Sequence, residues 1–171
     1  MERLAPVRDD VGYGDLAAVG QDEPYREVVG RLSCLRGVNL LTAMILVAEI
    51  WDFRRFPSAA AFSSYLGLVP SEHSSGSSER RGAITKAGNV HVRRALVEAA
   101  WHYRHPPSLD GAVGRRVQGQ DPAVVQQAFH AQRRLHRTYW KMVNRGRPSS
   151  VAAVAVAREL SGFLWGLMTA A

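Results

Sequence analysis

Apolar residues at helical spacing, separated by capping and helix-breaking residues, constrain the fold of this chain more than any other feature. The spacing predicts long helices over 89–105, 121–143 and 149–168. Asn89 is a suitable N-cap for the first of them, because its side chain can accept a hydrogen bond from an unpaired backbone N–H. Asp121 precedes a proline, and proline is favoured in the first turn of a helix. A chain with this pattern is expected to fold as a mainly α protein.

The first part of the chain predicts a helical hairpin. Its arms are 24–32 and 40–50, and its turn is 36–39. This arrangement resembles a helix-hairpin-helix, a motif whose turn presents backbone N–H groups to a DNA phosphate. Asn39 stands where such motifs have a second glycine, so a structural hairpin without DNA contact is an equal alternative. A shorter helix is predicted over 58–65, with serine as its N-cap.

A polar segment over 70–88 separates these helices from the long ones. It contains five serines and three glycines, with 83–85 as a candidate short strand. We expect this segment to be one long Ser/Gly/Arg-rich loop, and long loops in compact domains are usually functional or disordered. The domain organisation that follows is a linker or frayed segment over 1–23 and one helical domain over 24–171.

Composition is that of a folded globular protein, with 46% hydrophobic and 22% charged residues. No uninterrupted run of eighteen apolar residues is present, and the N-terminus lacks the pattern of a signal peptide. We therefore expect a cytoplasmic protein. Cys34 is the single cysteine, which excludes a disulfide framework within the chain and a cysteine cluster for zinc. Its apolar neighbours on a predicted helix favour a buried, inert thiol.

The charge of the chain is unevenly distributed. Residues 1–30 hold seven acids and three arginines, whereas the remainder holds eight acids and nineteen basic residues, only two of them lysines. Arginine suits bidentate contacts with phosphate, so a polyanionic partner is the natural interpretation. A GC-rich genome would also raise arginine over lysine, but it does not explain the excess of basic over acidic residues.

Candidate metal ligands are sparse. The carboxylates after residue 30 are scattered and form no tight cluster of the kind that holds magnesium for phosphoryl transfer. His102 and His105 are three residues apart, but no cysteine or acid nearby completes a ligand set, so a surface or DNA-contact role is favoured. We expect no cofactor or metal within this chain.

The polar segment concentrates a candidate nucleophile among cations. Ser74 and Ser75 precede Gly76, and His73 is a candidate base. A serine that attacks a phosphodiester needs positive charge to stabilise the transition state. The nearby cations are Arg80, Arg81, Lys86, Arg93 and Arg94. The alternative is a flexible loop that is rich in serine because serine suits loops.

The predicted helix over 121–143 carries a second basic feature. Arg133, Arg137 and Lys141 are spaced at i, i+4 and i+8, with Arg134 adjacent, opposite an apolar face. No acids are interleaved with them. This stripe is expected to follow a DNA or RNA backbone, and an ordinary solvated face is the alternative.

Several segments together resemble the C-terminal domain of the insertion-sequence transposases related to the Piv DNA invertase. The resemblance spans about 32–167 in the order and spacing of that family. The segments that carry it are 65–70 (YLGLVP), 74–76 (SSG), 82–89 (GAITKAGN), 93–96 (RRAL), 98–101 (EAAW) and 157–160 (AREL).

The resemblance implies a two-part enzyme. In the family, an N-terminal RuvC-like nuclease domain with an acidic DEDD site holds magnesium, and the helical domain provides a serine that forms a phosphoserine link to DNA. That serine corresponds to the residue before the glycine, which is Ser75 here, with Ser74 as the fallback. The resemblance also implies a structured guide RNA and assembly into homo-oligomers.

The resemblance fixes our functional expectation. The chain has no segment that could form the RuvC-like domain, so we expect a truncated, split or decayed transposase in which magnesium belongs to the missing domain. The leading hypothesis is the DNA-binding, serine-bearing domain of a transposase that cleaves and transfers strands, inactive without its partner domain. The alternatives are a non-catalytic nucleic-acid-binding remnant and a basic helical protein-interaction domain.

Overall fold

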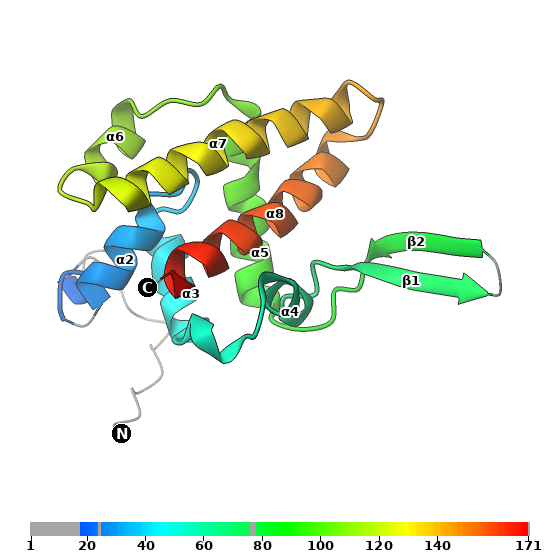
Figure 1. The fold of residues 1–171 in the computed structure, drawn as a ribbon, viewed down its shortest axis with the longest axis horizontal. Coiled ribbons are helices and arrows are strands. Elements are labelled where there is room, and N and C mark those ends of the chain that lie inside the picture. Colours follow the sequence, from blue (N-terminus) through cyan, green and yellow to red (C-terminus); the bar gives the residue numbers. More distant parts are fainter. Residues whose placement is uncertain (1–17, 24, 76–77, 171) are drawn as a thin grey trace.

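A computed structural model describes residues 18–23, 25–75 and 78–170. Figure 1 shows a body of packed helices from which one β-hairpin projects. The expectation of a mainly α protein is confirmed. Residues 1–17, which include most of the expected linker, lie outside the described residues, as does Gly76 of the predicted catalytic loop.

The helical hairpin consists of α2 (Tyr25–Ser33) and α3 (Leu40–Ile50). Asn39, which stands where a helix-hairpin-helix has its second glycine, does not adopt the positive φ that favours glycine. It has φ −85° and caps α3, where its side-chain oxygen accepts a hydrogen bond from Thr42 N–H at 2.9 Å. Gly37 does have a positive φ of 81°, and a Cβ there would overlap the carbonyl of Ala99. The turn is therefore shaped by packing on a neighbouring helix.

A short aromatic unit follows the hairpin. The 3-10 helix η1 (Phe53–Arg55) leads into α4 (Ala59–Tyr65), and Ser58 caps α4 by accepting from Ala61 N–H at 3.1 Å. The Phe62 ring, fully buried on α4, packs against both Phe53 and Phe56. The predicted extent and cap of this helix are both confirmed.

The prediction of one long loop over 70–88 is wrong, because most of this segment is a β-hairpin. The candidate strand at 83–85 is confirmed in part, since residues 83 and 84 end the second strand of this hairpin. Strands β1 (Pro70–Ser75) and β2 (Ser78–Ile84) pair antiparallel, from Pro70 opposite Ile84 to Ser75 opposite Ser78, with an irregularity between Pro70 and Glu72. We call this element the serine hairpin. Its strands lack the alternation of apolar and polar residues by which a half-buried strand is recognised in a sequence.

Three short elements follow the serine hairpin before the two long helices. Helix α5 (Val90–Ala100) is capped as predicted by Asn89, which accepts from Val92 N–H at 2.9 Å, and it continues as the 3-10 helix η2 (Trp101–Arg104). The short helix α6 (Gly111–Val117) was not predicted. It has one turn of apolar spacing and two glycines, which is too little pattern to distinguish it from a loop.

The last two helices, α7 (Pro122–Val143) and α8 (Ser149–Thr169), pack side by side in opposite directions (Figure 1). Helix α8 also contacts α2, α4 and α5, and Leu160, Leu164 and Leu167 are fully buried on it. Among the described residues, α8 alone is long and apolar enough to cross a membrane by length and composition. Its packing on four other helices accounts for that composition.

Candidate nucleic-acid interface

Backbone hydrogen bonds between the segment before β1 and the segment after β2 join the serine hairpin to the helical body. Thr85 N–H donates to Val69 O at 2.9 Å, and Lys86 N–H donates to Gly67 O at 3.1 Å. The Ser71 hydroxyl adds a bond to Ala83 O at 2.9 Å. These bonds bring the chain that enters β1 and the chain that leaves β2 together, so the hairpin is held at its base.

Two glycines allow this close approach. Gly67 has φ +65°, and a Cβ there would overlap the carbonyl oxygen of Ala87. Gly88 has φ +118°, and a Cβ there would overlap the carbonyl oxygen of Tyr65. Only glycine adopts such conformations without strain while admitting another backbone. The segments 65–69 and 85–89 thus form one anchor for the hairpin.

The predicted nucleophiles lie on this anchored element. Ser75 is the last residue of β1, and Ser74 is paired with Glu79 in the register of the two strands. The backbone of Arg80 pairs with that of His73, and that of Arg81 with Glu72. The side chains of 72–81 lie outside the described part of the structure. The backbone nonetheless places both serines at the end of the hairpin farthest from the anchor.

The cations predicted after the hairpin have separate environments. Lys86 is exposed at the anchor and has an unusual φ of +56°. Arg93 is half-buried, and its guanidinium donates to Leu66 O at 2.9 Å, so this side chain supports the anchor from α5. Arg94 is exposed. The structure therefore brings Lys86 and Arg93 to the hairpin base.

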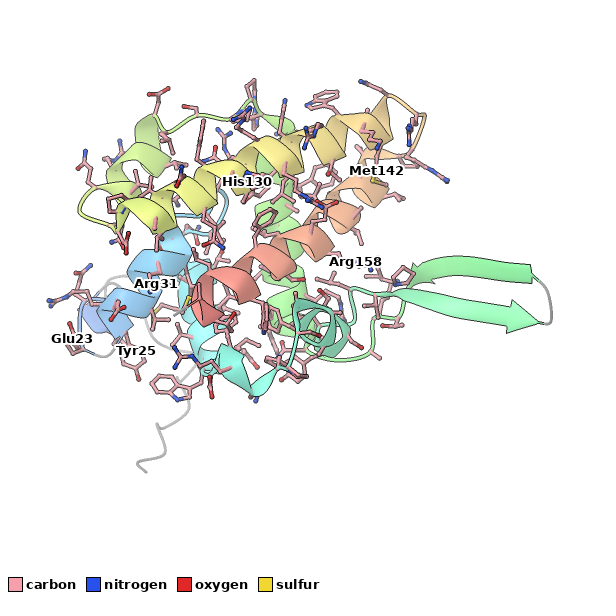
Figure 2. The ribbon with its side chains drawn as sticks, in the orientation of Figure 1. Glu23, Tyr25, Arg31, His130, Met142 and Arg158 are labelled. Atoms are coloured by element: carbon pink, nitrogen blue, oxygen red, sulfur yellow. The ribbon has the colours of Figure 1, made fainter. Side chains whose placement is uncertain are left out.

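An open groove of about 830 Å³ lies beside the hairpin base. Its walls are the base itself, α4 and the first half of α8, and Figure 2 shows Arg158 on the side of α8 toward the hairpin. The lining is mostly apolar, with Lys86, Arg158 and Glu159 as its charged residues. The apolar lining residues include Ala59, Ala60, Val69, Pro70, Ile84, Val151, Val154 and Ala155.

The predicted cationic stripe is present on α7. Arg133, Arg137 and Lys141, which we call the cationic stripe, are all exposed, and none of them forms an ion pair within the described residues. Arg134, predicted beside them, differs: its Nε lies 3.1 Å from Glu159 Oε2 on α8. The charge of Arg134 is therefore partly neutralised by this ion pair within the fold.

The stripe borders a basic hollow of about 410 Å³. Besides Arg133, Arg134 and Arg137, the hollow is lined by His130 and Pro107. A hollow surrounded by guanidinium groups has the charge and the donors to accept a phosphate group.

Comparison with known proteins identifies the family. Residues 30–110, from the end of α2 to the loop after η2, match the family model described as transposase, IS116/IS110/IS902 family. This segment is a transposase domain of that family. The match includes the whole serine hairpin and its anchor, whereas α7 and α8 lie beyond it.

Several proteins that are named as transposases match over more of the chain. The protein y4qE of Sinorhizobium fredii, named as a transposase, is 44% identical over 82% of this chain. The transposase for insertion sequence element IS1533 of Leptospira borgpetersenii is 33% identical over 71%, and that for IS1111A of Coxiella burnetii is 29% identical over 81%. The chain spans only about a third of the length of these relatives, at 36%, 35% and 32% respectively.

The two histidines considered as metal ligands lie in a cationic part of the structure. Burial, followed by the charges of Arg36 and His105, lowers the pKa of His102. The Nε2 atom of His105 accepts a hydrogen bond from Arg104 Nε at 3.2 Å. In the part of the chain that the structure describes, no three His, Cys, Asp or Glu side chains gather into a metal site. The described residues therefore provide no three-residue ligand set for a metal ion.

Two residues that no sequence pattern indicated extend the basic surface. Trp140 on α7 is 40% exposed, and its indole Nε1 donates to Arg104 O at 2.9 Å. Arg36 donates to Pro106 O at 2.5 Å, which brings another guanidinium to the same end of η2. The sequence feature that could have drawn attention to Trp140 is its position, three residues after Arg137 on a predicted helix without acids.

Proposed function

We propose that this chain is the DNA-binding, serine-bearing part of a transposase that cleaves and transfers DNA strands through Ser75. The serine hairpin carries the proposal. Within a segment of established transposase family, it is the element that projects from the helical body, it ends β1 at Ser75, and paired glycines fix its base. A rigidly held projection can bring a nucleophile to DNA that is too wide to enter a cleft.

The proposed chemistry is a pair of transesterifications. The Ser75 hydroxyl loses its proton to a base and attacks a phosphorus atom of DNA, and the bond to the departing strand breaks as that strand's oxygen takes up a proton. The protein then holds the DNA as a phosphoserine ester. A hydroxyl of a second strand attacks the same phosphorus and releases the serine. Each step builds negative charge that fixed cations stabilise.

The basic surface supports the DNA-binding part of the proposal. We assign the DNA backbone to the cationic stripe and the basic hollow beside it, and we assign further phosphates, away from the cut, to Lys86 at the hairpin base and to the exposed Arg94 on α5. Arg80 and Arg81 belong to the hairpin by backbone position. Arginine forks pair with phosphate in two hydrogen bonds, so this surface suits the backbone of a nucleic acid.

The remaining parts of the proposed enzyme lie outside this chain. Because the chain spans about a third of its relatives, the acidic RuvC-like domain and its magnesium, the guide RNA and a homo-oligomeric assembly belong to the proposal for the whole transposase. Its proposed location is the cytoplasm. The chain by itself is expected to bind DNA with little or no cleavage.

The test joins this chain to the part of the y4qE relative that lies outside the match and supplies DNA with the ends of the insertion sequence. A covalent protein–DNA band on a denaturing gel is expected for the wild type and for Ser74→Ala, and no band is expected for Ser75→Ala. Cleaved strands without a covalent band would reject the serine mechanism. Binding without cleavage by the joined protein would favour a non-catalytic remnant.

A further inference from the structure

Trp140 is an exposed aromatic residue whose indole N–H and ring are both held by neighbouring groups. Two-fifths of its surface is accessible. Its indole N–H is satisfied by Arg104 O, and its ring lies edge-on against Tyr139 at 5.5 Å and His136 at 6.5 Å between centroids. The His136 ring is itself fixed, since its Nδ1 lies 2.9 Å from Tyr103 O and donates to that carbonyl. The Trp140 ring is thus held in place by these neighbours, and part of its apolar surface stays exposed to solvent.

The surroundings of Trp140 are cationic. Arg133, Arg137 and Trp140 follow one another at i, i+4 and i+7, so they share one side of α7. Lys141 is adjacent in the chain, and Arg104 lies across the hydrogen bond on η2. The sequence of α7 contains no acid at all. Over about 10 Å of helix axis, a ring therefore stands in line with cations.

We propose that Trp140 is a stacking platform for an unpaired base of nucleic acid whose backbone lies on the cationic stripe. This inference rests on the proposed function, since it requires that the stripe bind nucleic acid. Phosphate contacts alone need no aromatic residue. A fixed aromatic face beside guanidinium groups suits single strands, because every base has a flat face to stack while the cations hold the phosphates on either side.

A structural role for the ring predicts a different arrangement. A tryptophan that serves only the fold is expected to leave less of its ring exposed than Trp140 does, as an aromatic side chain gains stability by burial. Trp140 instead keeps its N–H bonded and its ring partly exposed. Because the ring is already held in place, binding a base loses little side-chain conformational entropy. The shared ligand is an unpaired base flanked by phosphates, from either DNA or RNA.

The test measures binding of labelled single strands of about 12 nucleotides to the whole chain by fluorescence anisotropy. Three probes are compared: oligodeoxythymidine, oligouridine and an abasic deoxyribose strand of the same length. Wild type is expected to bind the base-bearing strands more tightly than the abasic one. Trp140→Ala is expected to weaken binding of a base-bearing strand by at least about 5-fold while its affinity for the abasic strand stays within about twofold.

Control variants separate stacking from folding and from charge. Trp140→Phe keeps a flat ring and is expected to retain most of the affinity. Trp51→Ala removes another exposed tryptophan, one that packs on Tyr25 of α2, and is expected to have no effect. Circular dichroism checks that each variant is folded.

The outcomes are distinct. A loss with oligouridine alone assigns the base to RNA, a loss with oligodeoxythymidine alone assigns it to DNA, and either supports the platform. Equal affinity of Trp140→Ala and wild type for both strands would overturn it, even if Arg133→Gln and Arg137→Gln weaken binding. If wild type binds none of the three strands and no duplex DNA, the proposed function itself fails.

Discussion

Cys34 illustrates how the fold sets the chemistry of a single side chain. The residue is fully buried, and this burial raises the pKa of its thiol to about 11, although Arg116 and Arg31 act in the opposite direction. The thiolate is the reactive form, so a raised pKa and burial both suppress reaction. The expectation of a buried thiol is confirmed.

We predict that Cys34 does not react with a thiol-specific reagent in the folded protein at pH 8. One equivalent should react after unfolding in guanidinium, as followed by absorbance of the released chromophore. Because the raised pKa belongs to the folded state, reaction of the native protein should begin only as the pH approaches about 11. Rapid labelling of folded protein at pH 8 would contradict the environment described for this residue.

Trp140 was missed at the residue scale for a physical reason. The helical pattern of α7 placed the cations correctly, since exposure of a regular helix follows from spacing. The partner of the indole is a carbonyl on η2, 36 residues away in the chain. No local pattern indicates such a contact, so a sequence cannot show that this ring is held open and not buried.

The serine hairpin depends on glycine at its anchor. We predict that Gly67→Ala lowers the free energy of unfolding by about 2–5 kcal/mol, because it forces a side chain into a positive φ and against the carbonyl of Ala87. Gly146→Ala is the matched control. Its φ is +78°, but nothing lies within 4 Å of the added Cβ, so only the conformational cost of about 1–2 kcal/mol is expected.

Urea unfolding followed by circular dichroism measures both variants. Equal losses for Gly67→Ala and Gly146→Ala would mean that the close backbone contact at the anchor contributes nothing. A larger loss at Gly67 would show that the two chain segments meet as described.

Most helices were predicted, because residues close together in the sequence mark where they begin. The serine hairpin was not predicted, because it forms by pairing of two strands. Asn89, Asp121 and Ser58 each cap a helix as expected, because a cap is decided by residues only two or three positions apart. The serine hairpin gives no such signal. Its strands hold serine, arginine and glutamate in place of alternating apolar residues, and its stability comes from pairing with each other and from the anchor.

At the scale of the whole molecule, the excess of basic residues predicts binding that weakens steeply with salt. Replacing all three stripe residues (Arg133→Gln, Arg137→Gln, Lys141→Gln) should weaken duplex DNA binding. It should also reduce the slope of log affinity against log salt by about 2–3, because each phosphate that the protein no longer neutralises lowers the slope by roughly 0.9.

Arg26→Gln is the control for this variant. Arg26 is exposed on α2 and lies 3.9 Å from Glu23, in the acidic first part of the chain. The Arg26→Gln variant should leave the slope of log affinity against log salt unchanged in titrations at several salt concentrations. An unchanged slope in the triple variant would remove the stripe from the DNA interface.

The family segment supplies the serine hairpin, and the helices after it supply the basic surface. That division explains why the fold and the cationic stripe could be anticipated from spacing, whereas the choice of Ser75 came from resemblance. Nothing in the local sequence separates Ser75 from Ser74, since both are serines at adjacent positions of β1. The two serines are distinguished only by which of them forms the bond to the phosphorus atom of DNA.

The most direct test of the central claim is to locate the phosphate in the covalent complex. The joined protein is reacted with DNA carrying the insertion-sequence ends, the DNA is digested with nuclease, and the peptide spanning 70–84 is sequenced by tandem mass spectrometry. We predict a nucleotide remnant on Ser75, absent from the Ser75→Ala protein. A remnant on any other residue, Ser74 included, would contradict the assignment.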